Sequence, residues 1–266
     1  MSGVIWPVGE DFPQYPLRVG YREVPPSVVE RIQMDTGPDK VAVVATAGWR
    51  QFNCSYYFDT QGQQNTFQDF WINDIRCGQD SFTWTHPRTG LSTQAEFDGY
   101  PKTVNDTTRF YVTYPMGFPA GNISDTWITT VSIRHLETVA PTGVPATWPL
   151  AGLFPQYPRH GTSMSYPGDV ITSDVRQRQR SIARPVVNAF SLVLTDVQLS
   201  AFDTFFVTEC GTGAETFALD IPSQQFEWGY RSSGVHSAKC RFVGTPVYEE
   251  VSTHYRVSGN IEWLQG

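Results

Sequence analysis

The chain opens with Trp6-Pro7-x4-Phe12-Pro13-Gln14-Tyr15-Pro16, and the motif returns with identical spacing as Trp148-Pro149-x4-Phe154-Pro155-Gln156-Tyr157-Pro158. The two copies begin 142 residues apart (148 − 6). Tryptophan and proline are rare residues, so chance does not account for a match of this length. A period this long corresponds to a whole domain and not to the short unit of a solenoid. The sequence therefore predicts two copies of one fold in tandem.

Each copy continues with a strand-like run of apolar residues, 52–58 in the first and 188–194 in the second. Each run ends at a residue whose short side chain suits a helix N-cap, Asp59 or Thr195. The segment Thr195–Gln198 also fits the capping-box pattern. Both patterns indicate that a helix begins directly after the strand.

A short helix is predicted within 59–76 in the first copy and at 195–209 in the second, because aromatic and aliphatic residues recur near the 3.6-residue period. These apolar faces should be buried against a sheet. Their members are Phe67, Phe70 and Trp71 in the first helix, and Leu199, Phe202, Phe205 and Phe206 in the second.

Both predicted helices run into a Cys-Gly pair, Cys77-Gly78 and Cys210-Gly211. We therefore expect Cys77 and Cys210 to occupy equivalent positions. The four cysteines of the chain form no metal-ligand pattern with histidine. We expect all four to be buried or half-buried free thiols with a structural role.

The motif Phe-x-Gly-x-Pro follows at Phe97–Pro101 and Phe242–Pro246, and each copy ends on a long alternating strand. The predicted domains are residues 1–137, with an inserted loop or hairpin at about 102–124, and residues 148–266. The linker, 138–147, contains two prolines and no helical periodicity, so it should be extended and stiff.

Composition favours a folded, mainly β protein. Of the 266 residues, 40% are hydrophobic and 14% aromatic, while 17% are charged. Short runs rich in aromatic residues and threonine alternate with Gly, Pro, Asn and Asp, which is typical of β architecture. The net charge of −7 disfavours high-affinity binding to the DNA backbone. No apolar segment approaches 20 residues, so no membrane span is expected, and the opening residues do not resemble a signal peptide.

The sequence predicts no enzyme and no catalytic, cofactor or metal site. None of the five histidines lies in a metalloprotease pattern, and no phosphate-binding glycine loop occurs. The cluster of aspartates around the first helix (Asp59, Asp69, Asp74 and Asp80) could supply paired carboxylates for acid-base chemistry, but its members fit a helix cap and an exposed helix face better. His86 is expected in a turn or at the surface.

The most concentrated basic stretch, residues 176–180, contains Arg176, Arg178 and Arg180 at alternate positions. In a strand, this spacing places the three guanidinium groups on one face. That face is either solvated, or paired with an acidic neighbouring subunit, or in contact with nucleic acid. We take these arginines as the candidate subunit interface, and expect the segments Arg18–Val44 and Arg159–Arg184 to contact neighbouring subunits.

The order of these motifs resembles the tail-tube-like domain family of long-tailed bacteriophage tail proteins. The second copy is the better match, through 176–180, Thr195–Phe206, Phe242–Pro246 and Val257-Ser258. The first copy keeps the same order but is longer in the 102–124 region. The resemblance implies two tandem β-sandwich domains, each with one short flanking α-helix, that assemble into rings around a DNA channel. It also implies the absence of an enzymatic activity and of a cofactor.

On this resemblance, the chain is expected to be a structural subunit of a phage tail, made in the bacterial host cytoplasm and located in the virion tail. The tail tube protein is the first expectation, as a homotrimer whose six domains form a pseudo-hexameric ring that stacks on further rings and contacts other tail proteins. Genomic DNA would pass through the lumen without specific binding. The alternatives are a distal tail or hub ring protein at the tip, and a tandem carbohydrate-binding module whose aromatic side chains stack on sugars.

Overall fold

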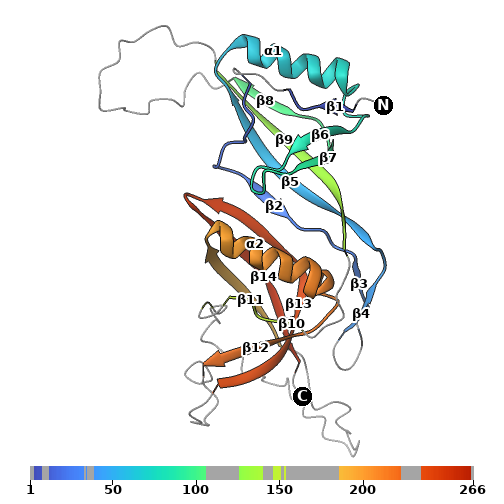
Figure 1. The fold of residues 1–266 in the computed structure, drawn as a ribbon, viewed down its shortest axis with the longest axis vertical. Coiled ribbons are helices and arrows are strands. Elements are labelled where there is room, and N and C mark those ends of the chain that lie inside the picture. Colours follow the sequence, from blue (N-terminus) through green and yellow to red (C-terminus); the bar gives the residue numbers. More distant parts are fainter. Residues whose placement is uncertain are drawn as a thin grey trace, which may run out of the picture. The chain divides into compact units, whose positions relative to one another are not determined.

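A computed structural model of the chain describes residues 3–7, 12–32, 34, 39–105, 126–139, 146–150, 153, 186–222 and 235–264. The described chain consists mainly of β-strands with two short α-helices (Figure 1), so the mainly β prediction is confirmed. It divides into two compact units. Unit 1 consists of Met1–Pro26, Ala47–Glu137 and Val247–Tyr255, and unit 2 of Ser27–Thr46, Thr138–Pro246 and Arg256–Gly266.

Each unit is therefore built from segments that are far apart in the sequence. Unit 2 includes Ser27–Thr46 from the N-terminal half, and unit 1 includes Val247–Tyr255 from the C-terminal half. The contiguous ranges 1–137 and 148–266 of the sequence analysis differ from this grouping at those two segments.

Unit 1 contains a curled mixed sheet. Its strands, in sheet order, are β1 (Val4–Ile5), β6 (Phe82–Thr85), β7 (Ser92–Phe97), β9 (Trp127–Thr138), β5 (Ala47–Phe58), β2 (Arg22–Val24) and the end of β13 (Val235–Val251). β1 is parallel to β6, and β8 (Lys102–Asn105) pairs with β9. The alternation along β5 buries Phe52, Cys54, Tyr56 and Phe58 on one face, as period-2 patterning requires.

Unit 2 pairs its strands in a similar way. β10 (Ala146–Thr147) is parallel to β12 (Phe217–Pro222), which is antiparallel to β13. β14 (His254–Leu264) pairs with β13 and with β11 (Val186–Leu194). A separate antiparallel hairpin, β3 (Val29–Ile32) and β4 (Lys40–Val43), completes the unit.

The two helices lie where the sequence predicts them. α1 (Gln61–Asp69) continues into the π-helical turn η1 (Phe70–Asp74), and α2 (Asp196–Thr204) continues into η2 (Phe205–Glu209). The predicted Thr195 cap and capping box are confirmed. The cap of α1 is Thr60, whose side chain accepts from the Gln63 backbone N–H, and not the predicted Asp59. Asp59 instead donates its backbone N–H to the Gln63 side chain.

The helix faces are core, as predicted. Leu199, Phe202, Phe205 and Phe206 are each 0% exposed, and Phe67 and Phe70 are 2% and 1% exposed, whereas Trp71 is half-buried. Each short helix continues into a wider π turn, and these turns add Phe70 in unit 1 and Phe205 and Phe206 in unit 2 to the buried rings. In each, a backbone N–H donates five residues back, from Ile75 to Phe70 at 3.1 Å and from Cys210 to Phe205 at 2.8 Å.

Four aromatic side chains form the same arrangement in each unit. In unit 1 they are Trp6, Phe70, Phe82 and Phe97, and in unit 2 Trp148, Phe205, Phe217 and Phe242. We call each set an aromatic quartet. The Phe82 and Phe97 ring centroids lie 4.9 Å apart with planes at 32°, and those of Phe217 and Phe242 lie 4.9 Å apart at 33°. The tryptophan backbone N–H also makes the same bond in both, to the carbonyl of Thr83 or Ala218.

The predicted equivalence of Cys77 and Cys210 is wrong. Ile75 is the residue that matches Cys210, because both donate to the first phenylalanine of the π turn and both accept from the glycine three residues on. Those glycines, Gly78 and Gly213, both have positive φ and both lie beside the last phenylalanine of the quartet. Cys77 therefore corresponds to Thr212.

Candidate functional site: two buried ion-pair clusters

A fully buried carboxylate, Glu23, lies at the centre of a charged cluster in unit 1. It is held by β2, which is hydrogen-bonded between β5 and β13 so that Glu23 is the register partner of Phe52 and of Tyr248. The Arg50 guanidinium donates to Glu23 Oε1, and Arg88 donates to both carboxylate oxygens at 3.1 and 3.4 Å. Arg50 comes from β5, so the ion pairs tie β2 to its neighbour in the sheet.

Further polar groups complete the cluster. Tyr21 Oη donates to Glu23 Oε2 at 3.1 Å, and Arg50 Nε donates to Glu137 Oε2 at 2.6 Å. His86 Nδ1 accepts from the backbone N–H groups of the two residues after Pro87, at 3.2 and 3.4 Å. This leaves the opposite ring nitrogen, Nε2, to carry the proton that faces Glu23, at 3.7 Å from Oε1.

The electrostatics keep Glu23 ionised. Burial opposes the charged form, but His86 and the guanidinium groups of Arg88 and Arg50 outweigh it, and the pKa of Glu23 lies well below its ordinary value. The pKa of Tyr21 is raised by burial and by the adjacent Glu23 charge. Burial and the same carboxylate also raise the pKa of the Cys54 thiol.

This cluster is poorly suited to proton transfer. Its carboxylate accepts from two guanidinium groups and a phenol, and a general acid or base needs a pKa near the working pH and access to a substrate. A buried carboxylate paired with two guanidinium groups fixes geometry instead. We therefore interpret the Glu23 cluster as the clamp that holds β2 against β5 in unit 1.

Unit 2 contains a second cluster, which holds the β3–β4 hairpin. Arg241 donates to Glu262 Oε2 at 2.7 and 3.2 Å, and Arg31 of β3 donates to the same oxygen at 3.3 Å. Arg31 also donates to the carbonyl of Phe242, and Arg241 donates to the carbonyl of Asp39 at 3.0 Å. The hairpin and the sheet therefore share one buried carboxylate, since Glu262 is 2% exposed.

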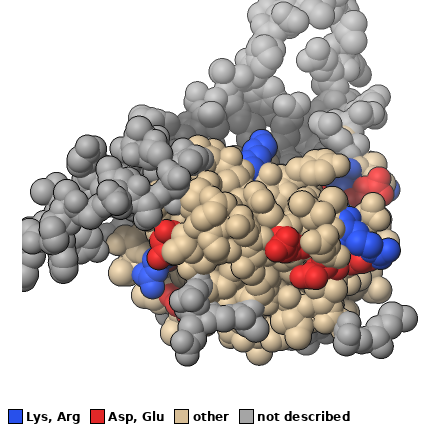
Figure 2. Space-filling model, turned by 90° about the horizontal axis from the view of Figure 1, so that it is seen from above, with Lys and Arg blue, Asp and Glu red and all other residues tan. Residues whose placement is uncertain are grey.

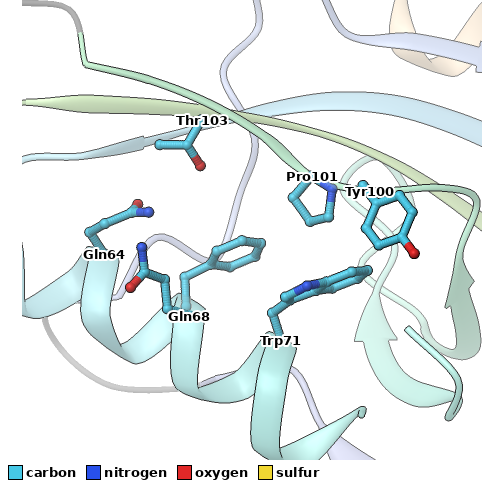
Figure 3. A pocket seen from close by; sticks show the side chains of 7 residues that line it. Gln64, Gln68, Trp71, Tyr100, Pro101 and Thr103 are labelled. Carbon is cyan, nitrogen blue, oxygen red and sulfur yellow. The ribbon is translucent and has the colours of Figure 1, made fainter. Parts of the chain in front are cut away.

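A small pocket opens beside α1 (Figure 3). Its volume is about 130 Å³, below the 300–1,000 Å³ of ordinary ligand pockets. Gln64 is buried and its Oε1 has no hydrogen-bond partner. Trp71 and Tyr100 meet edge to face, with ring centroids 6.1 Å apart and planes at 67°. The lining residues are Gln64, Phe67, Gln68, Trp71, Tyr100, Pro101 and Thr103.

Charge at the surface is sparse and mixed. Figure 2 shows acidic and basic side chains close together among mainly uncharged residues on the face it draws. One exposed pair is Arg76 with Asp80, whose hydrogen bond lowers the pKa of the carboxyl. No group of three or more possible metal ligands occurs within the described ranges. The helices that the structure describes are too short and too polar to cross a membrane.

The sequence-predicted candidates have different outcomes. Arg176, Arg178 and Arg180 lie outside the described residues, as does most of the predicted insertion at 102–124. His86 was expected in a turn or at the surface. It begins a turn, since the Gly90 backbone N–H donates to its carbonyl at 2.9 Å, but its side chain is only 5% exposed.

All four cysteines are free, as predicted, and Cys54, Cys210 and Cys240 are buried. Burial raises the pKa of Cys240 to about 12. It also raises the pKa of Cys210, with smaller contributions from Glu209 and Glu215. These three thiols are therefore poor nucleophiles. Cys77 is exposed, contrary to the prediction of a buried or half-buried position. Its counterpart Thr212 has the same positive φ and is buried, so the local backbone conformation does not decide the exposure.

Sequence reasoning missed the charged clusters, although one signal was present. Arg50 shares the alternation of Phe52, Cys54, Tyr56 and Phe58, so it lies on the buried face of its strand. An arginine at an inward position requires a buried acidic partner. The identity of that partner, Glu23, was not evident because it lies 27 residues away on a strand of only three residues.

No protein-family model and no curated protein matches this chain.

Proposed function

We propose that this chain is a tandem duplication of a tail-tube-like β-sandwich domain, and that it serves as a structural subunit of a bacteriophage tail. The sequence resemblance to that family supports the assignment to tails. The described geometry supports the duplication, and the two clusters act as structural clamps and not as a catalytic centre.

The matching aromatic quartets are the observation that carries the duplication. Each quartet takes one tryptophan from the position directly after a two-residue strand, one phenylalanine from a π turn, and two phenylalanines from paired strands. Side-chain packing of this detail is set by many positions at once. From Thr60 to Phe82 in unit 1 and from Thr195 to Phe217 in unit 2, equivalent residues keep a constant offset of 135 (195 − 60).

A duplicated domain suits a ring. Three chains with two similar domains each supply six positions around one axis, so a trimer imitates a six-domain ring. Such rings stack into a tube or form a collar at the tail tip. The net charge of −7 is compatible with a lumen through which DNA passes without being held. We propose the tail tube protein as the first assignment and the distal tail or hub ring protein as the second.

Electron microscopy of the purified protein tests this proposal. We expect closed rings of three chains, or tubes built from them, and a sedimentation coefficient that rises with protein concentration. A protein that stays monomeric at high concentration and forms neither rings nor tubes would refute the ring function. The copy number per virion separates the two tail positions, because a tube needs many rings and a tip needs one.

Within the described ranges, the aromatic side chains give the carbohydrate-binding alternative little support. A sugar platform needs exposed rings that lie flat side by side. Trp71 and Tyr100 meet edge to face, and the ring of Trp49 is covered by the Arg134 guanidinium, which lies 4.5 Å from its centroid.

A further inference from the structure

Equivalent residues of the two units form a surface that is buried in unit 2 and exposed in unit 1. At the offset of 135, Ile72 corresponds to Val207 and Cys77 to Thr212. Val207 is 5% and Thr212 2% exposed, whereas Ile72 is 55% exposed and Cys77 is exposed. The same difference holds beside the last quartet phenylalanine, where the side chain of Arg241 is 9% exposed and that of Glu96 is 40% exposed.

In unit 2 this face is covered by the Ser27–Thr46 segment. The backbone N–H of Val28 donates to Thr212 Oγ1 at 3.2 Å, and Val28 itself is 1% exposed. Arg31 and Asp39 of the same segment bond to the carbonyl of Phe242 and to Arg241. A segment distant in sequence thus buries the residues around Thr212.

In unit 1 the equivalent residues form an exposed surface that we call the open face, made of Ile72, Cys77, Glu96 and Asp98. We group these residues because the Ser27–Thr46 segment bonds to the counterparts of two of them in unit 2, Thr212 and Arg241. The carboxylates of Glu96 and Asp98 are paired with Arg134 at 3.3 and 3.7 Å but are 40% and 41% exposed. The open face therefore combines an apolar side chain with accessible acidic ones.

The second copy of the sequence contains a segment that matches the one covering unit 2. At the offset of 142 set by the opening motif, Pro25 corresponds to Pro167 and Val28-Val29 to Val170-Ile171. The matching segment, residues 159–184, contains five arginines and two aspartates. Its excess positive charge complements the open face, where two carboxylates share the single guanidinium of Arg134.

The segments that the two units exchange indicate that the covering segment of unit 1 comes from a second copy of the chain. Unit 2 takes Ser27–Thr46, while unit 1 takes Val247–Tyr255. These are not counterparts: the former follows an opening motif, and the latter follows a Phe-x-Gly-x-Pro motif. If the exchange followed a two-fold axis, each unit would supply the other with the same segment. An exchange of different segments is head-to-tail, and it continues from copy to copy until a ring closes or a filament grows.

We propose that the open face of unit 1 binds residues 159–184 of a second copy of this chain, with Val170 of that copy at Cys77. The proposal deepens the ring function, but it rests only on the duplication and not on a role in phage tails. This contact between two chains would be equivalent to the contact by which Ser27–Thr46 covers unit 2 within one chain.

A disulfide cross-link tests the contact, using the native Cys77. The variant Val170→Cys is concentrated, oxidised and run on a non-reducing gel. We expect covalent species of two and three chains, and their loss when Cys77→Ser is added. The matched control is Val28→Cys with Thr212→Cys in a Cys77→Ser background, which should form a link within one chain because Val28 N lies 3.2 Å from Thr212 Oγ1.

Each result decides the matter. A link between Cys77 and position 170 within a single chain would overturn the assignment to a second copy. The absence of any link, when the control pair links, would overturn the docking itself. If the chains link but electron microscopy shows open filaments and no ring or tube, the ring function fails while the contact stands.

Discussion

Replacing Glu23 by Gln removes the buried charge of the unit 1 cluster without leaving a cavity. Glu23 is 0% and Arg50 2% exposed, so the substitution leaves two guanidinium groups with one remaining carboxylate, Glu137. Breaking a buried ion pair on one side costs about 3–5 kcal/mol. That is a large part of the roughly 5–15 kcal/mol by which folded domains are stable. We expect the urea midpoint of the Glu23→Gln variant to fall accordingly.

The pH dependence provides an independent check. The pKa of Glu23 is lowered in the folded state, so its stabilising contribution is fully present above the unfolded pKa of about 4.3 and is lost as the pH falls through the folded pKa. Wild-type protein should lose stability over that acidic range more steeply than Glu23→Gln. The control is Asp80→Asn, whose exposed partner is Arg76, and which should leave the urea midpoint unchanged. A Glu23→Gln variant within about 1 kcal/mol of wild type, with an identical pH profile, would refute the clamp.

Three further outcomes are expected. Phe202→Ala should lower the free energy of unfolding by about 3–5 kcal/mol, because the ring is fully buried, whereas Val197→Ala on the exposed side of α2 should stay within about 0.5 kcal/mol in the same urea titration. Thr195→Ala should cost about 1 kcal/mol through loss of the capping box; an unchanged urea midpoint would contradict the cap. Neither 1–137 nor 148–266 should show native near-ultraviolet circular dichroism when expressed alone, because each lacks a segment of its unit; a cooperative, native-like half would contradict this.

Local features of the fold could be predicted from the sequence because they depend on neighbouring residues. The Thr195 capping box and the buried faces of both helices follow from spacings of three and four residues. The assignment of the first cap to Asp59 was wrong because two adjacent residues could each serve, and Thr60 is the one aligned with the Gln63 N–H. The equivalence of the Cys-Gly pairs was also wrong, since it followed residue identity, whereas the hydrogen bonds of the turn follow position.

The charged clusters could not be predicted in the same way. Arg31 and Glu262 are 231 residues apart in the sequence, and no local pattern joins them. The buried position of Arg50 could be inferred from the alternation of β5. The location of Glu23 depended on the pairing of a three-residue strand with two distant strands, which only the assembled sheet reveals.

The division of the units has a consequence for the order of events during synthesis. Unit 1 contains the N-terminal residues but is completed by Val247–Tyr255. The ribosome must therefore have added residue 255 before the first unit has its full set of strands. Until then β2 lacks one of its two neighbours and exposes a sheet edge, and exposed edges are prone to pairing with other chains. A stop codon just before residue 247 would thus damage unit 1, although most of that unit lies in the N-terminal part of the sequence.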